Sequence, residues 1–317
     1  MGDEPRDREL HVVQVPGPGA EDVLVGDDGR VWTGTADGSV FAVEDEGRRI
    51  TRVARTGGRP LGLDWWPDGR LLVCDAHRGL LAVDTESGDV ETVADSVGGR
   101  RMVFCNNADV SADGVVWFSD SSARWPIEEW KNDLIDDTCT GRLLRLEPGG
   151  EVEVVLGGLS FANGVALAPD ESFVTVAETG HRTLRRVWLT GERQGAADDF
   201  VTDLPCHPDN TSTGTDGLIW VSAASPKDPT LTFLQTKAPP WAKATARRMP
   251  EALKPSPKRT VRVQAYDPDG RLVHDISCDA SDYHMVTGVR EHAGRVWLGS
   301  LVEPALAWFD LQEGEGS

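Results

Sequence analysis

Six copies of one short pattern run through this 317-residue chain, and they constrain its fold more than any other feature. Each copy is an apolar strand, a tight turn that ends in Asp-Gly or a similar pair, and a second apolar strand. The turns lie at Gly29, Gly69, Gly114, Glu171, Gly217 and Gly294. A unit of roughly 40–45 residues with several short strands is typical of one blade of a β-propeller. The sequence therefore predicts an all-β fold, a six-bladed β-propeller, with a β-sandwich of similar size as the alternative.

The predicted ring has to close, because an open propeller would leave sheet edges exposed. Residues 10–15 form a strand-like run that belongs to no blade of its own. We expect this run to add the outer strand to the last blade, with residues 305–311 as that blade's third strand. The whole chain, residues 1–317, is then one propeller domain.

Two of the spacings between turns are long, and both require insertions. These fall at residues 121–141 in the third blade and about 225–260 in the fifth, in loops that join second and third strands. The fifth-blade insertion has helix formers between Pro240 and Pro250, so we expect a helical lid there, with a disordered basic segment as the alternative. Four aromatic side chains of the insertions are expected to wall an apolar substrate pocket: Trp125, Trp130, Phe233 and Trp241.

The charge of the chain excludes one class of partner. With 52 acidic and 32 basic residues its formal net charge is −20, which disfavours binding to a phosphate backbone, so we expect no nucleic-acid partner. The first residues are charged and lack an apolar signal region, and no run approaches the roughly 20 apolar residues of a membrane span. Five scattered cysteines argue against a disulfide framework. We expect a cytoplasmic protein with a small-molecule substrate, and the sequence leaves its oligomeric state open.

One position precedes each turn by eight residues, and four of its six occupants carry oxygen donors. In chain order the six are Glu21, Leu61, Asn106, Asn163, Asp209 and Val286. An equivalent register on every inner strand would aim them at one mouth of the central channel. Carboxylates and side-chain amides suit Ca²⁺, although another divalent metal is possible, and the absence of Cys and His argues against zinc. The alternative is that Asn and Asp merely mark strand starts, because these residues favour turns.

Histidines are the usual candidates for acid–base catalysis. His77 and His181 fall in loops expected on the metal face, His284 precedes the sixth inner strand, and His207 lies two residues before Asp209. Any one of them is more often an exposed or core residue than a catalytic one. No nucleophile elbow, Walker loop or dinucleotide fingerprint is present.

Several segments resemble the strictosidine-synthase-like branch of the calcium-dependent lactonase and esterase propellers, which also include paraoxonases, gluconolactonases and regucalcin, and the squid-type diisopropylfluorophosphatase. The segments are GRPLGL (58–63), FCNNADVSADGVVWFSDSS (104–122), FANGVALAPDESFVTVAET (161–179), LPCHPDN (204–210) and VTGVREHAGRVWLGSL (286–301). The resemblance implies a catalytic Ca²⁺ held by Glu21, Asn106, Asn163, Asp209 and Asn210. In gluconolactonase-like members the aspartate that matches Asp209 is also a proposed base.

Two departures from these relatives limit what the resemblance implies. Plant strictosidine synthase uses a glutamate on its last inner strand for a Pictet–Spengler condensation, and the matching pocket residue here is Thr287. Paraoxonases carry a histidine at the start of the second inner strand, where this chain has Leu61. Neither mechanism carries over unchanged.

We therefore expect a Ca²⁺-dependent hydrolase of a lactone or ester. The metal would polarise the carbonyl, and Asp209, or a histidine such as His284 or His77, would activate water as the general base. One alternative is a biosynthetic cyclase, isomerase or condensing enzyme that uses the same metal-centred pocket. A second alternative is a non-catalytic ligand-binding propeller in which the metal is structural.

Overall fold

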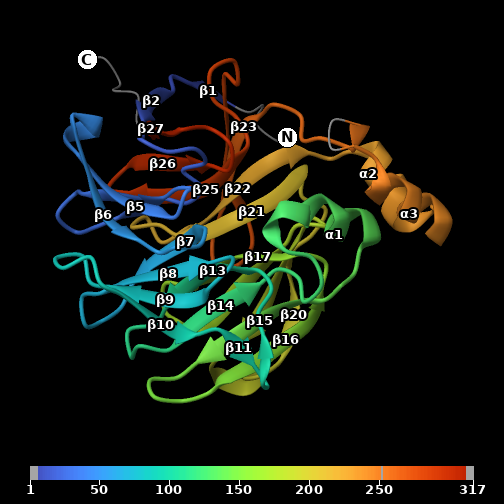
Figure 1. Ribbon diagram of the computed structural model, residues 1–317, viewed down its shortest axis with the longest axis horizontal. Helices are drawn as coiled ribbons and strands as arrows, with labels where there is room; N and C mark the ends of the chain where they lie inside the picture. The colour runs from blue at the N-terminus through green and yellow to red at the C-terminus, as the bar shows by residue number, and fades with distance from the viewer. Residues whose placement is uncertain (1–5, 251–252, 312–317) are drawn as a thin grey trace.

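The computed structural model describes residues 6–250 and 253–311 and shows six antiparallel sheets that follow one another in chain order around a ring (Figure 1). From the channel outward, blade 1 comprises β3 (Leu24–Val25), β4 (Val31–Gly34), β5 (Ser39–Glu44) and β6 (Arg49–Arg55). Blade 2 comprises β7 (Pro60–Trp65), β8 (Leu71–Asp75), β9 (Gly79–Val83) and β10 (Val90–Ala94). Blade 3 comprises β13 (Cys105–Val110), β14 (Val116–Asp120), β15 (Gly141–Leu146) and β16 (Val152–Leu159). Blade 4 comprises β17 (Ala162–Leu167), β18 (Phe173–Glu178), β19 (Thr183–Trp188) and β20 (Ala197–Val201). Blade 5 comprises β21 (Cys206–Thr213), β22 (Ile219–Pro226), β23 (Val261–Tyr266) and β24 (Leu272–Cys278). Blade 6 comprises β25 (Val286–His292), β26 (Arg295–Ser300), β27 (Ala305–Asp310) and β2 (His11–Gln14). The predicted six-bladed propeller is confirmed.

The ring closes as the sequence predicts. Strand β2 pairs antiparallel with β27, so that His11 lies opposite Trp308 and Gln14 opposite Ala305. The last blade is thus built from both ends of the chain, and neither of its middle strands is left as a free edge. A further short strand, β1 (Arg6–Arg8), pairs in parallel with the outer strand of blade 5.

Apolar side chains fill the spaces between neighbouring blades, because each blade strand alternates its residues between two faces. Between blades 2 and 3, for example, Leu72, Phe118 and Leu144 pack together with no solvent exposure. Between blades 5 and 6 the buried Trp220 and Phe309 share one such layer. The propeller therefore has a ring of cores and leaves its centre to polar side chains.

Every inner strand from blade 2 to blade 6 contains a β-bulge at the same place. Pairing with the second strand is interrupted between Pro60 and Leu63, Cys105 and Ala108, Ala162 and Val165, Pro208 and Thr211, and Val286 and Val289. The two residues inside each bulge are released from strict alternation, so both can approach the channel. The sixth hairpin is one residue shorter than the others, and its equivalent bulge residue is therefore Thr287. The expected sixth register residue, Val286, is instead paired with Ser300 and buried in a hydrophobic core.

Helices occur in both insertions, whereas the sequence predicts them only in blade 5. The third-blade insertion carries η2 (Ile127–Glu129) and α1 (Trp130–Asp136); the fifth-blade insertion carries α2 (Pro229–Thr236), which Asp228 caps, and α3 (Pro240–Arg248). Helix α1 packs against both α2 and α3 to form a lid. The other short elements are η1 (Asp45–Gly47), β11 (Ser96–Val97), β12 (Arg100–Arg101) and η3 (Gly191–Arg193). Within the described ranges, the model contains no helix of the length and apolarity that crossing a bilayer requires.

Candidate metal centre

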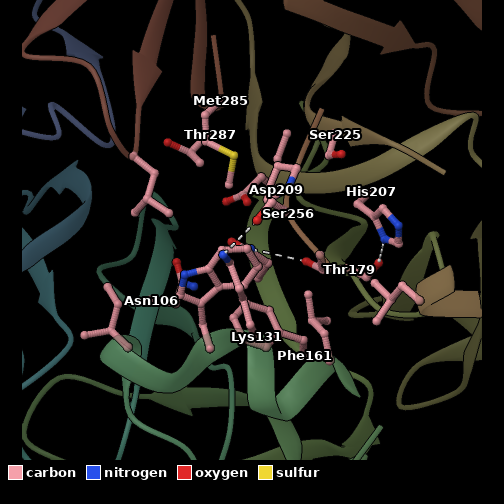
Figure 2. Close-up of a pocket in the computed structure, with 18 of the residues that line it drawn as sticks. Asn106, Lys131, Phe161, Thr179, His207, Asp209, Ser225, Ser256, Met285 and Thr287 are labelled. Carbon is pink, nitrogen blue, oxygen red and sulfur yellow. Dashed lines mark hydrogen bonds between the residues drawn. The ribbon is translucent and has the colours of Figure 1, made fainter. Parts of the chain in front are cut away.

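A cavity lies between the lid helices and one mouth of the central channel (Figure 2). Its space, counted with its open mouth, is about 850 Å³, a size typical of small-molecule sites. The first bulge residue of each blade from 2 to 6 lines it, and so does Glu21, which lies just before β3 of blade 1; the six are Glu21, Leu61, Asn106, Asn163, Asp209 and Thr287. The register therefore converges on one mouth of the channel, on the face that carries the insertions, as the sequence predicts.

The residue that follows each of these six alternates between polar and glycine around the ring. Blades 1, 3 and 5 have Asp22, Asn107 and Asn210, and blades 2, 4 and 6 have Gly62, Gly164 and Gly288. A Cβ on Gly62 would lie 2.6 Å from the Cα of Asn107, and one on Gly164 would lie 2.1 Å from the Thr211 nitrogen. The glycines thus let neighbouring inner strands approach closely enough for side chains of one blade to form hydrogen bonds with the backbone of the next. Asp22 accepts from the Leu63 N–H at 3.0 Å, and Asn107 accepts from the Val165 N–H at 2.8 Å.

Three buried amide oxygens at the channel mouth have no hydrogen-bond partner. They are the Oδ1 atoms of Asn106, Asn163 and Asn210. Their amide nitrogens are engaged elsewhere. The Nδ2 of Asn106 donates to Ser121 at 2.8 Å, and that of Asn163 donates to Thr179 at 3.2 Å. The Nδ2 of Asn210 lies 3.4 Å from both carboxylate oxygens of Glu21. A buried acceptor without a donor is costly, so three at one place make this a suitable site for a cation.

The carboxylates at this mouth are crowded together and buried. Burial, followed by the charges of Asp22 and Asp209, raises the pKa of Glu21 well above its usual value. Burial likewise raises the pKa of Asp209 to about 7 and that of Asp22 to about 6. Arg59 opposes the shift at Glu21 and Arg290 opposes the shift at Asp22, but burial outweighs both. Such a cluster would be relieved by a bound divalent cation.

The donor set fits a hard cation. Carboxylates of Glu21 and Asp209 and amide oxygens of Asn106 and Asn163 line the same cavity, and Asn210 contacts Glu21 from the next layer. All of these are oxygen donors, the type that Ca²⁺ prefers. The structure therefore brings together every residue predicted as a ligand, and the identity of the metal stays a prediction.

One histidine, His207, lines the cavity, on the side away from Asn106 (Figure 2). It lies on β21 and is buried; its Nδ1 is 2.9 Å from the Thr179 carbonyl oxygen. A carbonyl only accepts, so Nδ1 carries the proton and Nε2 is left with its lone pair. That Nε2 is buried without a partner. Burial lowers the pKa of His207.

The wall of the cavity above the polar floor is apolar. Phe104 and Phe161 meet edge to face, with ring centroids 5.4 Å apart, beside Leu61. The lid adds Trp130, Leu134, Ile135 and Leu231. Trp130 and Thr287 therefore lie where the sequence predicts. The Thr287 hydroxyl donates to the Glu21 carbonyl at 2.8 Å, which fixes the junction between blades 6 and 1.

Three of the predicted pocket aromatics lie elsewhere. Phe233 and Trp241 are 53% and 72% exposed, because α2 and α3 turn their small or aliphatic residues inward instead. Trp125 stacks with the guanidinium groups of Arg124 and Arg247 at the junction of the two insertions. The prediction that these three line the pocket is wrong, since helix faces decide it and the insertions have too little periodicity to reveal them.

The two histidines predicted as bases also lie outside the cavity lining. His77 is exposed, and its Nε2 is 2.7 Å from Glu128 on the lid insertion. His284 is held between Glu303, which its Nδ1 contacts, and Arg259, 3.4 Å from its Nε2. Both rings are engaged in surface ion pairs, so the structure does not support either as a base for cavity chemistry.

Asp22 belongs to the channel cluster and was not predicted there. Glu21 and Asp22 precede β3 (Leu24–Val25), so strand alternation does not hold them on opposite faces, and their charges interact at the channel mouth. His207 had a usable signal, since it lies two residues before Asp209 on the same strand.

Comparisons with known proteins agree with this fold. A family model described as strictosidine synthase matches residues 106–192, and one described as strictosidine synthase-like, N-terminal, matches residues 9–43. The adipocyte plasma membrane-associated protein of Salmo salar is 35% identical over 92% of this chain and 77% of its own length. The Arabidopsis thaliana protein strictosidine synthase-like 13 is 35% identical over 62% of this chain and 49% of its own length.

Solved structures share the fold at low identity. A gluconolactonase from Xanthomonas campestris superposes with a TM-score of 0.70 at 16% identity, covering 96% of this chain and 90% of that one. The calcium-binding protein regucalcin from Agrobacterium tumefaciens gives 0.65 at 15% identity, covering 96% and 94%. At such identities the likeness establishes the propeller alone.

Proposed function

This chain belongs to the strictosidine synthase-like family of six-bladed propellers, and from that premise we propose that it is a calcium-dependent hydrolase of a lactone or ester. One observation carries the proposal. Three unpartnered amide oxygens and two buried carboxylates meet at the floor of an otherwise apolar cavity. A purely structural polar plug would satisfy those oxygens within the protein.

The ligand roles follow from which side-chain atoms are unengaged. Glu21, Asp209, Asn106 and Asn163 would hold the cation from the cavity floor, and the unpartnered Oδ1 of Asn210 would join them while its amide supports Glu21. When bound, a divalent cation supplies a Lewis acid for an ester carbonyl. Ser121 and Thr179 fix the two asparagine amides so that their oxygens stay turned toward the cavity.

His207 is the proposed general base. Its Nδ1–H is held by the Thr179 carbonyl, which leaves the lone pair on Nε2 to accept a proton from water. The same contact keeps the ring at the cavity wall and stabilises the protonated form that results. Neither His77 nor His284 lines the cavity.

The lining of the cavity defines the substrate class. Trp130, Leu134, Phe104 and Phe161 would bind an apolar acyl or alcohol part and exclude water from the reacting carbonyl. A lactone or ester of medium chain length satisfies both this wall and the polar floor. Small polar sugar lactones would leave the wall unused.

The test is hydrolysis of a panel of lactones and aryl esters with alkyl chains of increasing length, with Ca²⁺ and after exhaustive chelation. We expect turnover that rises with chain length, disappears on chelation and returns with Ca²⁺. Turnover that survives complete metal removal would refute the metal-dependent mechanism. Absence of turnover across the panel, despite Ca²⁺ binding at the channel, would instead refute the hydrolase assignment.

A further inference from the structure

A second group of potential metal ligands lies outside the cavity, between the lid and blade 4. Among the described residues, the donor atoms of Asp137, Cys139 and His181 all lie within 4.8 Å of one another. The Nε2 of His181 is 3.2 Å from Asp137 Oδ2, and Cys139 Sγ is 3.7 Å from Asp137 Oδ1. The group joins two segments, one after α1 and one after β18, that are about forty residues apart in the chain.

The backbone around these residues is held in unfavourable conformations. Asp137, which ends α1, has φ of 52°, and Cys139 has φ of 48°. Non-glycine residues rarely adopt this left-handed region, and such strain concentrates at functional sites. On the other side, a Cβ on Gly180 would lie 2.0 Å from Ser160 Oγ, so only glycine lets the His181 loop approach so closely.

A buried carboxylate orients the histidine from behind. Glu178 is 4% exposed, and its Oε1 lies 3.0 Å from His181 Nδ1. The same oxygen accepts the Ser160 N–H at 2.8 Å, which fixes its position. A carboxylate that accepts Nδ1–H leaves Nε2 to the metal, the arrangement found behind most metal-binding histidines.

We propose that Asp137, Cys139 and His181 form a binding site for a transition-metal ion such as Zn²⁺, separate from the channel site. One thiolate, one imidazole and one carboxylate form a donor set that suits zinc, whereas the oxygen-only set of the channel suits calcium. The His181 side chain is 45% exposed, so an ion from solution can reach the group.

The consequence would be a clamp on the lid. Asp137 caps the helix that carries Trp130, Leu134 and Ile135 to the cavity wall, and His181 belongs to blade 4. A metal held by both segments fastens the end of α1 to the propeller. The site does not depend on the proposed hydrolase activity, because no member of it lines the cavity.

The competing account is an ion pair without metal. The hydrogen bonds to Asp137 and then Glu178 raise the pKa of His181 to about 10, so that in the absence of metal the ring is a cation between two carboxylates. A metal probe that reports on the thiolate separates the two accounts. Of the five cysteines, all within the described ranges, Cys139 alone is not buried.

The experiment uses the full-length protein, reduced, stripped of metal and saturated with Ca²⁺ to fill the channel. We expect the protein to bind one equivalent of Co²⁺ and to show the absorption spectrum of tetrahedral Co²⁺ together with a thiolate-to-metal charge-transfer band. Added Zn²⁺ should displace the Co²⁺ and abolish both signals. Cys139→Ser should remove the band, and His181→Gln should weaken Co²⁺ binding at least about tenfold. Glu178→Gln should keep the band and weaken binding roughly 10–100-fold. Cys206→Ala serves as the matched control and should change neither.

Two results would overturn the proposal. Co²⁺ binding without any thiolate band, or with a band that Cys139→Ser leaves intact, would show that the metal lies elsewhere. Absence of Co²⁺ and Zn²⁺ binding beyond the channel would leave His181, Asp137 and Glu178 as an ion pair only. Because His181 is exposed, His181→Gln is expected to fold, and its circular dichroism spectrum checks this directly.

Discussion

Carboxylates at the centre of this propeller lie beside other carboxylates, whereas carboxylates at its rim are paired with arginines. At the channel mouth Glu21, Asp22 and Asp209 are buried beside one another, and burial raises the pKa of each. On the outer strands carboxylates lie opposite arginines instead. In blade 4 the Nε atoms of Arg185 and Arg186 are each 2.9 Å from a carboxylate oxygen of the facing strand β20.

The difference shows which carboxylates the protein neutralises with its own side chains. In blade 4 the rim carboxylates Asp198 and Asp199 are neutralised by arginines of the facing strand, so that hairpin satisfies these charges locally. The channel carboxylates of blades 1 and 5 instead raise one another's pKa, and under the proposed function a cation from solution would neutralise them. The same chemical change, Asp to Asn, should therefore have unrelated consequences at the two places.

The largest effect is expected from Asp209→Asn. Removing one ligand charge from a buried cation site should lower kcat/KM for the best ester about 1,000-fold or more, since metal polarisation is worth several kcal/mol. The increase in Tm that Ca²⁺ gives the parent protein should disappear in parallel. Kinetic assays and thermal unfolding with and without Ca²⁺ measure both. Full activity in this variant would contradict the assignment of the channel as the metal site.

The next effect is expected from His207→Gln, which keeps a polar side chain but removes the base. We expect kcat to fall roughly 100-fold, in the range that general-base catalysis contributes. The Ca²⁺-induced rise in Tm should persist, which separates this residue from the metal ligands. His77→Gln, at an exposed surface pair, is the matched histidine control. Equal losses in the two variants would remove His207 from the mechanism.

The channel residues could be predicted from the sequence where a signal within the same short segment fixes their position. The Asp-Gly turns are local signals, and counting back from them finds Glu21, Asn106, Asn163 and Asp209 correctly. The same count fails at Val286, because the sixth hairpin is one residue shorter and only strand pairing reveals the shift to Thr287.

Counting residues back from the turns predicts neither the orientation of Asp22 nor which face of each lid helix meets the cavity. Whether Asp22 turns to the channel depends on where strand pairing begins in blade 1, since Asp22 lies just before β3, and no single segment encodes that start. Whether Phe233 or Leu231 of α2 faces the cavity depends on how the helix docks on its neighbours. Packing between elements distant in the chain decides both.

Removal of metal should have the third largest effect. With Ca²⁺ at about 100 times its Kd, binding adds about 2.7 kcal/mol to the free energy of unfolding. Chelation should then lower Tm by roughly 5 °C, since 1 kcal/mol corresponds to a few degrees in a chain of this size. Thermal unfolding over a series of Ca²⁺ concentrations measures this dependence. A Tm independent of Ca²⁺ would mean that the channel satisfies its own charges, as the rim does.

The smallest effect is expected at the rim, from Asp198→Asn. Asp198 accepts from Arg186 at 2.9 and 3.1 Å and from the Trp188 indole at 3.3 Å, and these bonds lower its pKa to about 2. A folded-state pKa below the usual 3.8 stabilises the fold above that pH, and the contribution is lost as pH falls through about 2. After screening by solvent, the variant should be about 1 kcal/mol less stable at pH 7. Urea unfolding should show this difference shrinking between pH 5 and pH 3, while the Ca²⁺-induced rise in Tm at pH 7 stays that of the parent. A loss of Ca²⁺ response in this variant would show that rim and channel are coupled, and the contrast between them would fail.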